Sequence, residues 1–289
     1  MRALPLSIVL ATILGLLPLR AEAQLERSAT GVNSGAIQTT VDQFRTDLGG
    51  SLNPNVSGSF GSGRREINWD GVPDALSAPN NLPANFFNVN SPRGAVFSTP
   101  GTGFQVSANA INPTSTPIEF GNINPTYPGL FTTFSPQRLF TAVDSNTVDV
   151  DFFVPGSNIP AFVRGFGAIF TDADLANTSS ISFFGASNTP LGSFLVPALA
   201  GNETLSFLGV SFADAIVSRV RITSGNAALG AGVNEAGERD LVVMDDFIYG
   251  EPVAVPAPIA GAGVPAVALL GLAGAWFVRR KRDRAGQGS

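Results

Sequence analysis

The 289-residue chain contains no cysteine and no histidine. Without cysteine no disulfide can stabilise the fold, so packing, hydrogen bonds and bound cations must do so. Without cysteine and histidine the chain can form neither a Ser-His-Asp or Cys-His catalytic centre nor a zinc site with histidine ligands. These absences exclude nucleophilic hydrolysis of the usual kinds.

Glycoside cleavage by a pair of carboxylates is a hydrolytic chemistry that needs neither residue. Asp149, Asp151 and Glu203 are candidate acids for such a reaction. Because any acidic β-rich protein offers such pairs, their presence is weak evidence. We therefore expect that the chain is not an enzyme.

Lysine is nearly absent, and acidic residues outnumber basic ones. Residues 24–250 contain 10 arginines, no lysine and 19 acidic residues, which gives a net charge of −9. A surface this acidic does not neutralise phosphates, which excludes nucleic acid as a partner. The same charge is compatible with divalent cations or with solubility outside the cell.

Residues 1–23 have the three parts of a secretory signal peptide. Arg2 precedes an apolar run at 4–19, and the Ala-Glu-Ala sequence at 21–23 is a cleavage site of the small-x-small type. We therefore expect the protein to be exported, with Gln24 as the first residue of its mature form.

The C-terminal residues 259–278 carry no charge, and a basic segment at 279–289 follows them. With a rise of about 1.5 Å per residue, a helix of this length matches the ~30 Å hydrocarbon core of a bilayer. Basic residues at one end of such a span favour the cytoplasmic side. We therefore expect a transmembrane helix at 259–278 that anchors the protein in the membrane. The cluster that would face the cytoplasm includes Arg279, Arg280, Lys281 and Arg282.

A Pro-rich linker at 251–258 leads into this span and ends in Pro256, Ala257 and Pro258. The motif, the LLGLAG sequence in the span and the RRKR cluster together resemble the PEP-CTERM sorting signal of Gram-negative bacteria that produce exopolysaccharide. Ala257 stands where that family usually carries Glu. The resemblance implies that an exosortase, a processing enzyme embedded in the membrane, is a partner. It also implies a final location at the cell surface or in the extracellular matrix.

Residues 24–250 are predicted to form one exported all-β domain. Its first part, 24–128, is rich in Gly, Pro, Asn and Ser, which indicates long loops with brief strands. Its second part, 129–250, contains successive strand-like runs such as NTVDVDFFV, in which apolar and polar residues alternate. Strands at this spacing, with 22 phenylalanines to fill the space between sheets, predict a β-sandwich of the jelly-roll or lectin-like type.

The start of this domain has a different pattern. Residues 24–35 are small and polar, and we expect them to form a loose lead-in. Apolar residues then recur at helical spacing from Ile37 to Leu48, and Gly49 ends the pattern. This pattern predicts one short amphipathic helix whose apolar face docks on the β-domain.

Three pairs of acidic residues are candidate cation sites. Asp172 and Asp174 follow a strand, in a loop where carboxylates and backbone carbonyls supply the oxygen ligands that Ca²⁺ prefers. Asp245 and Asp246 lie near the last strand, Asp70 and Asp74 lie earlier in the chain, and none of the three pairs matches an EF-hand. The alternative is that these acids only form Asx-turns at strand ends.

Trp69, Asp70 and Asp74, in the sequence INWDGVPD, are a candidate ligand-binding group. The indole could stack on a sugar ring beside two carboxylates, or it could anchor a loop in the core. Trp69, Tyr127 and Tyr249 are the only Trp or Tyr residues between 24 and 250. This scarcity argues against a glycosidase cleft and against a strong sugar-binding face.

These observations favour an exported, non-enzymatic surface protein that is structural or adhesive in association with extracellular polysaccharide. A calcium-dependent carbohydrate-binding module is the alternative. It would bind a carbohydrate saturably and would lose this binding when a chelator is added. Two further alternatives are a glycoside hydrolase and an ice-binding protein. The Thr-rich repeats that form a flat ice-binding surface are missing from the sequence.

The signal peptide and the sorting tail predict the mass of the mature protein. Intact-mass measurement of the protein from cell-surface and membrane fractions should give a species that starts at Gln24 and ends near Pro256–Pro258. A species that keeps the full tail would show a simple single-span membrane protein and would contradict processing.

Overall fold

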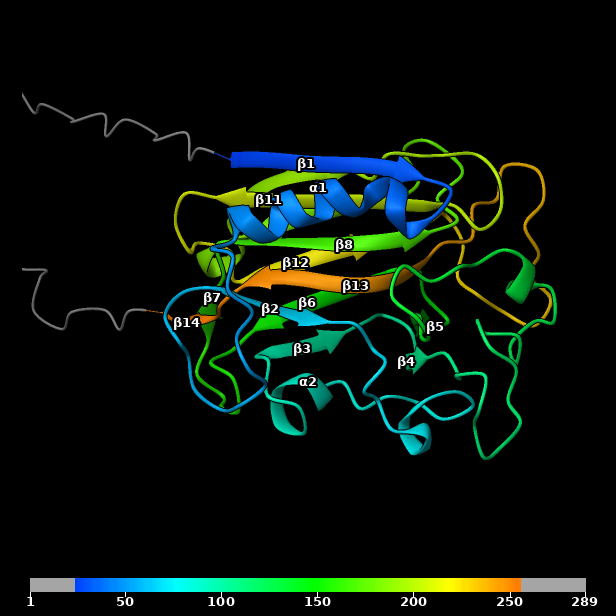
Figure 1. The fold of residues 1–289 in the computed structure, drawn as a ribbon, viewed down its shortest axis with the longest axis horizontal. Coiled ribbons are helices and arrows are strands. Elements are labelled where there is room, and N and C mark those ends of the chain that lie inside the picture. Colours follow the sequence, from blue (N-terminus) through cyan, green and yellow to red (C-terminus); the bar gives the residue numbers. More distant parts are fainter. Residues whose placement is uncertain (1–23, 256–289) are drawn as a thin grey trace, which may run out of the picture. The chain divides into compact units, whose positions relative to one another are not determined.

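The computed structural model describes residues 24–255, in which antiparallel β-strands dominate (Figure 1). The predicted signal peptide, the Pro256–Ala257–Pro258 motif, the span at 259–278 and the basic cluster after it lie outside the described residues. Within residues 24–255, no helix has the length and apolar character needed to cross a membrane. The chain divides into two units after Ala254, and the first contains every strand described below.

The strands are short, with few helices between them, as the density of turn-forming residues predicts. The strands are β1 (Gln24–Gly31), β2 (Arg64–Ile67), β3 (Ala95–Ser98), β4 (Gly103–Val106), β5 (Phe140–Val143), β6 (Thr147–Phe152), β7 (Ala161–Phe162), β8 (Gly165–Thr171), β9 (Ser180–Phe184), β10 (Pro190–Leu195), β11 (Leu205–Phe212), β12 (Arg219–Thr223), β13 (Val243–Gly250) and β14 (Val253–Ala254). The α-helices are α1 (Ser34–Asp47) and α2 (Phe86–Val89), and three 3₁₀ turns lie at Asp74–Leu76, Tyr127–Gly129 and Ala186–Asn188.

The strands form two main antiparallel sheets. The larger has the order β1-β11-β8-β13-β5-β4, with β2 also pairing with β13, and the smaller has the order β10-β9-β12-β6-β3. The short strands β14 and β7 pair separately. The expectation of an all-β fold built from short strands is therefore confirmed.

The two main sheets share one hydrophobic core. Phe140 and Phe247 of the larger sheet belong to the same buried cluster as Phe97 and Val150 of the smaller sheet. Edge-to-face ring contacts connect the sheets, as between Phe97 and Phe247, whose centroids are 6.2 Å apart. Such aromatic pairs add to the stabilisation that the buried area itself provides. Phenylalanine fills the interior, as its abundance predicts.

Helix α1 covers the opposite face of the larger sheet, where it runs along β1, β11 and β8 (Figure 1). The Asn33 side chain caps the helix by accepting a 3.1 Å hydrogen bond from the Ala36 N–H. The ring of Phe44 enters the sheet above Gly167 and Gly209, where an added Cβ would lie 2.7 and 2.8 Å from it. The predicted amphipathic helix and its docking are confirmed. Its apolar side packs in a second cluster containing Ile37, Val41, Phe44, Leu48, Phe134, Ile169, Leu205, Phe207 and Ile248.

The predicted loose lead-in is wrong. Residues 24–31 form β1, which pairs along its whole length with β11, from Gln24 opposite Phe212 to Gly31 opposite Leu205. Its side chains are mostly exposed because β1 is an edge strand that is held by backbone hydrogen bonds. A polar edge strand has no alternating apolar pattern, so the sequence showed no strand there.

The end of β13 is fastened by a buried ion pair. Glu251 is 4% exposed, and its carboxylate accepts bonds of 2.6 and 2.9 Å from the Arg65 guanidinium, which is fully buried. The same carboxylate accepts a 2.8 Å bond from the Asn53 side chain and a 3.1 Å bond from the Phe60 N–H. This group therefore fixes the 52–62 loop against the point where β13 ends.

Phe44→Ala should lower the free energy of unfolding by about 3–5 kcal/mol, because it leaves a cavity between α1 and the sheet. Gln43→Ala changes the exposed face of the same helix and should stay within about 0.5 kcal/mol of the wild type. Urea denaturation measures both values. Equal effects of the two variants would contradict the docking of α1.

Candidate functional site

An acidic cluster lies where β8 ends. Asp172 directly follows β8, Asp174 lies two residues later, and Glu235 comes from the long loop between β12 and β13. One carboxylate oxygen from each of the three residues lies within 4.8 Å of the others. The structure thus brings the two acids predicted from the sequence together with a third from more than sixty residues away.

Asp172 is the unusual member of this cluster. The residue is 0% exposed, and neither of its carboxylate oxygens has a hydrogen-bond partner among the described residues. Its backbone is held in the left-handed region at φ 67°, and its N–H donates a 3.0 Å hydrogen bond to the Thr204 carbonyl. The Asx-turn alternative does not apply to Asp172, because its carboxylate accepts no hydrogen bond from any residue between 24 and 255.

The electrostatics of the cluster are unfavourable without a cation. Burial, followed by the charges of Glu235 and Asp174, raises the pKa of Asp172 to about 9. Burial is also the main cause that raises the pKa of Asp174 and of Glu235 above their ordinary values. No arginine among the described residues forms an ion pair with any of the three. A cation bound between these carboxylates would favour their charged forms and so act against both burial and mutual repulsion.

Asp240 supports the loop that carries the cluster. It is fully buried, and its carboxylate accepts a 3.0 Å bond from the Asp174 N–H and a bond from the Thr178 hydroxyl. Asp174 in turn accepts a 3.1 Å bond from the Gly201 N–H. The fold therefore positions Asp174, while Asp172 and Glu235 lie close enough to share a proton.

The group at 69–74 has a structural role. The Trp69 indole is 1% exposed, stacks on the Phe140 ring at 4.1 Å and donates a 2.9 Å bond to the Asp245 carbonyl. Its faces are not open to a sugar ring, because the hydrophobic core covers them. Asp70 accepts bonds from the Gln137 and Arg138 N–H groups, and burial raises the pKa of its carboxyl group.

Asp74, like Asp70, contacts the loop that precedes β5. Its carboxylate forms a 2.5 Å ion pair with the Arg138 guanidinium, which is almost fully buried. Asp70 and Asp74 are therefore held by the loop that precedes β5 and do not form an open ligand site together with Trp69.

The glycosidase candidates are divided between the two sheets: Asp149 and Asp151 lie two residues apart on β6, where the charge of Asp149 adds to burial in raising the pKa of Asp151, and Glu203 lies apart from them. Asp149 lies on β6, where its carboxylate accepts bonds of 2.7 to 3.0 Å from Arg219 and Arg221 of the neighbouring strand β12. Asp151 lies on the same strand, and burial raises the pKa of its carboxyl group. Glu203 lies in a loop before β11 of the other sheet.

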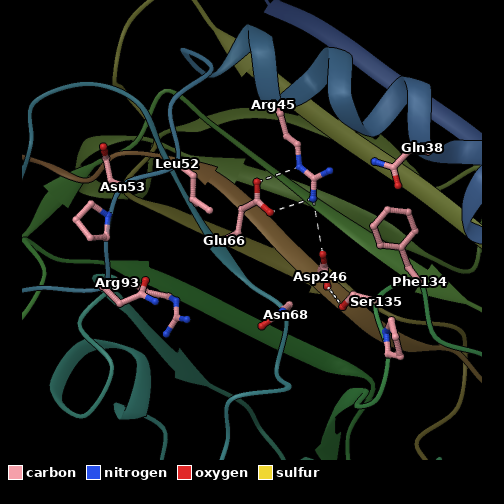
Figure 2. A pocket seen from close by; sticks show the side chains of 13 residues that line it. Gln38, Arg45, Leu52, Asn53, Glu66, Asn68, Arg93, Phe134, Ser135 and Asp246 are labelled. Carbon is pink, nitrogen blue, oxygen red and sulfur yellow. Dashed lines mark hydrogen bonds and ion pairs between the residues drawn. The ribbon is translucent and has the colours of Figure 1, made fainter.

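A second constellation surrounds a pocket of about 670 Å³ between α1, β2 and β13 (Figure 2). Its walls come from α1, the 52–55 loop, the end of β2, the residue Arg93 and the loop at 134–136. Asp246 of β13 lies among them. Polar side chains therefore converge here from segments that are far apart in the sequence.

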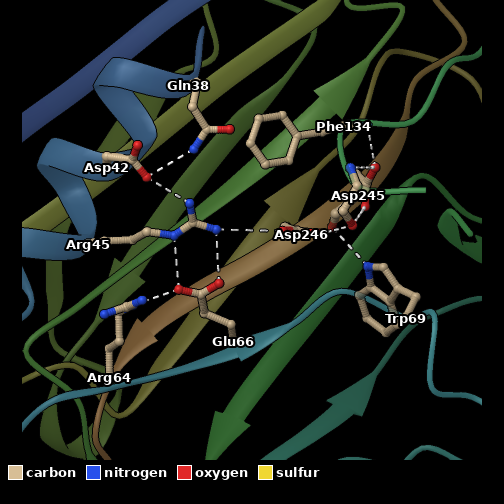
Figure 3. A network of polar contacts seen from close by, with 10 residues as sticks. Gln38, Asp42, Arg45, Arg64, Glu66, Trp69, Phe134, Asp245 and Asp246 are labelled. Atoms are coloured by element: carbon tan, nitrogen blue, oxygen red, sulfur yellow. Dashed lines mark hydrogen bonds and ion pairs between the residues drawn. The ribbon is translucent and has the colours of Figure 1, made fainter. Parts of the chain in front are cut away.

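Arg45 of α1 crosses the top of this pocket and is neutralised by acids (Figure 3). Its Nε and Nη2 atoms each donate a 3.0 Å bond to the Glu66 carboxylate, and Nη1 donates a 2.9 Å bond to Asp42. Asp246 lies 4.0 Å from Nη2. This network connects the polar side of α1 to β2 and β13.

Asp245 and Asp246 are adjacent buried carboxyl groups at an irregularity in β13, where the pairing register with β8 shifts. Burial, followed by the charge of Asp246, raises the pKa of Asp245 well above its ordinary value. Burial raises the pKa of Asp246 to about 6, while the Ser135 hydroxyl, 2.6 Å away, acts in the opposite direction. Two such neighbours titrate as a pair, so one proton is shared between them near neutral pH.

Sequence reasoning missed Glu235, Arg93 and the Arg45–Glu66 pair. Glu235 lies in a Gly-rich loop with no ligand spacing to Asp172, and the pocket residues belong to separate segments. The charged face of the predicted helix was the only local signal for Arg45.

No protein-family model matches the chain, and no curated protein matches it. Among solved structures, the chain is similar to the enzymatically active domain of tailspike protein 4 from bacteriophage CBA120, at 12% identity and a TM-score of 0.27. The match covers 62% of this chain and 22% of that chain. A likeness at this level implies nothing about the function of this chain.

Asp246→Asn should make stability less dependent on pH. Because the folded state holds a proton that the unfolded state releases above pH ~4, the Asp246 contribution is present at low pH and is lost as pH rises through about 6. The variant should therefore gain up to about 3 kcal/mol relative to wild type between pH 4 and 7. Urea denaturation at several pH values measures this, with Asp214→Asn, an exposed acid, as control. Parallel pH profiles of wild type and Asp246→Asn would contradict it.

Proposed function

We propose that the protein is an exported, non-enzymatic component of the bacterial cell surface or extracellular matrix whose β-domain binds Ca²⁺ at Asp172, Asp174 and Glu235. The observation that carries the cation site is the Asp172 carboxylate, which is fully buried and has no hydrogen-bond partner among the described residues. A buried charge of this kind is costly unless it is paired or coordinates a metal.

The donor set selects a hard cation. Three carboxylates are offered, and the chain has no histidine or cysteine that would favour zinc or copper. Ca²⁺ accepts six to eight oxygen ligands in flexible geometry, which backbone carbonyls and water can complete around three carboxylates. Mg²⁺ demands near-ideal octahedral geometry and keeps most of its water ligands, so it fits the buried Asp172 carboxylate less well.

The cation would act as a cross-link in a protein without disulfides. Asp172 and Asp174 belong to the β8–β9 connection, whereas Glu235 belongs to the β12–β13 connection. An ion between them would tie the two loops together. This role fits an exported structural or adhesive protein.

The finer description of the fold and of sorting belongs to the same proposal. A sandwich of the jelly-roll or lectin-like type is supported by the hydrophobic core that the two main sheets share. Export by the signal peptide, anchoring by the span at 259–278 and processing by an exosortase are supported by the sequence motifs of the two ends. The last strand, β14, ends at Ala254, so the sorting motif at 256–258 follows the β-domain directly.

Calcium should raise the melting temperature of the protein. At a hundredfold excess over Kd the stabilisation is about 2.7 kcal/mol, which corresponds to roughly 5–10 °C for a domain of this size. Asp172→Asn should abolish this increase and, in EGTA, should melt above the wild type, because asparagine is neutral without the proton that the buried Asp172 carboxyl group must take up when no cation is bound. Differential scanning fluorimetry with CaCl₂ or EGTA measures both effects.

Asp214→Asn, which removes an exposed acid outside the cluster, is the matched control and should keep the full response to calcium. Equal melting temperatures of the wild type in calcium and in EGTA would refute the cation site. An equal response of wild type and Asp172→Asn would place the calcium elsewhere.

A further inference from the structure

The pocket between α1, β2 and β13 contains a cation that the protein does not neutralise. Arg93 lines the pocket and forms no ion pair with any described carboxylate. Its Nε is buried without a hydrogen-bond partner, and its guanidinium lies over the Phe87 ring at 5.1 Å. Nη1 donates a hydrogen bond to the Ser91 hydroxyl. The stem is thus packed in place, and only part of the planar donor group is left without a partner among the described residues.

The other arginine of the pocket is in the opposite condition. Arg45 donates three hydrogen bonds to Glu66 and Asp42 and is fully occupied by them. In the view of Figure 2, Arg93 lies on one side of the pocket, Asp246 and Ser135 lie on the other, and Asn68 lies between them. The pocket therefore has a cationic side and a carboxylate side.

Neutral hydrogen-bonding groups line the space between these charges. The side-chain amides of Asn55 and Asn68 are exposed and make no hydrogen bond to other described residues. Each amide offers a donor and an acceptor, which is what a sugar hydroxyl requires. Leu52, 57% exposed, adds an apolar surface at the rim.

We propose that this pocket binds a carboxylate-bearing saccharide, such as a hexuronate residue of an acidic polysaccharide. The saccharide carboxylate would pair with the Arg93 guanidinium, whose planar geometry matches a carboxylate. The hydroxyl groups would bond to Asn55 and Asn68 and donate to the Asp246 side of the pocket. A volume of about 670 Å³ is in the range of small-molecule sites.

The charges limit which anion fits. Asp246 and Glu66 repel negative charge on their side of the pocket, so a ligand with a single carboxylate at one end and hydroxyls at the other is favoured over a compact polyanion such as phosphate. This inference rests on the proposed role beside extracellular polysaccharide. It does not rest on the calcium site, since none of the three cluster acids lines the pocket.

Isothermal titration calorimetry of the purified protein tests the inference with tetramers of galacturonate, glucuronate and mannuronate. Each is compared with its carboxyl-reduced counterpart, which for galacturonate is the galactose tetramer of the same linkage. At least one acidic tetramer should bind, and its neutral counterpart should bind at least about tenfold more weakly. Inorganic phosphate serves as a separate probe and should not compete.

Two pairs of variants identify the site. Arg93→Met keeps the stem over Phe87 but removes the charge, and it should weaken binding by about 10–100-fold. Arg27→Met, which removes an arginine that does not line the pocket, is its control. Asn68→Ala and Asn90→Ala are a second pair, and since both side chains are exposed, folding should be unaffected.

Three results would overturn the inference. These are no binding of any acidic tetramer, equal binding of the acidic and neutral tetramers, and undiminished binding by both Arg93→Met and Asn68→Ala. The calcium proposal is tested separately, by the melting temperature. A protein that is stabilised by calcium and binds no acidic tetramer would retain the proposed cation site and lose the saccharide site.

Discussion

The structure depends on hydrogen bonds by which Asp245 of the central strand β13 holds two distant segments, one at Trp69 and one at Phe134–Ser135. Its carbonyl accepts the Trp69 indole N–H, and its carboxylate accepts the N–H groups of Phe134 and Ser135 at 2.6 and 3.2 Å. Trp69 then packs at the centre of the aromatic core, while Phe134 packs under α1. Because these contacts are buried, they are not exchanged for water, and the two faces of the larger sheet are fixed by one residue.

A second constraint comes from the acidic composition, because residues 24–250 contain no lysine. Each carboxyl group that is buried must be either paired with an arginine or protonated. The structure shows two solutions. Glu251 is paired with the buried Arg65, and Asp149 is paired with arginines across two strands. The carboxyl group of Asp245 is kept protonated by a raised pKa. Asp172 has no hydrogen-bond partner among the described residues, and burial raises its pKa to about 9, so it too stays protonated unless a cation binds there, as proposed above.

Helix α1 links the architecture to the inferred binding pocket. Its apolar side packs on the larger sheet through Phe44, which requires glycine at positions 167 and 209. Its polar side presents Arg45 and Gln38 to the pocket. The apolar face of the helix therefore packs on the core, and its polar face forms one wall of the pocket. The acidic cluster and the pocket are thus two distinct proposed ligand sites on one β-scaffold.

The sequence alone determined the features that depend on local pattern and composition. Strand alternation, turn-forming residues and the 3.6-residue period predicted the β-class and α1, the missing histidine and cysteine excluded whole classes of chemistry, and Asp172 and Asp174 were visible as a pair. Only the tertiary structure decided that β1 is an edge strand, that Glu235 completes the acidic cluster and that Arg93 has no carboxylate partner among residues 24–255. These features arise from backbone pairing and from contacts between distant segments. Neither produces a periodic pattern in the sequence, because the burial of a residue and the identity of its partners are properties of the packed fold.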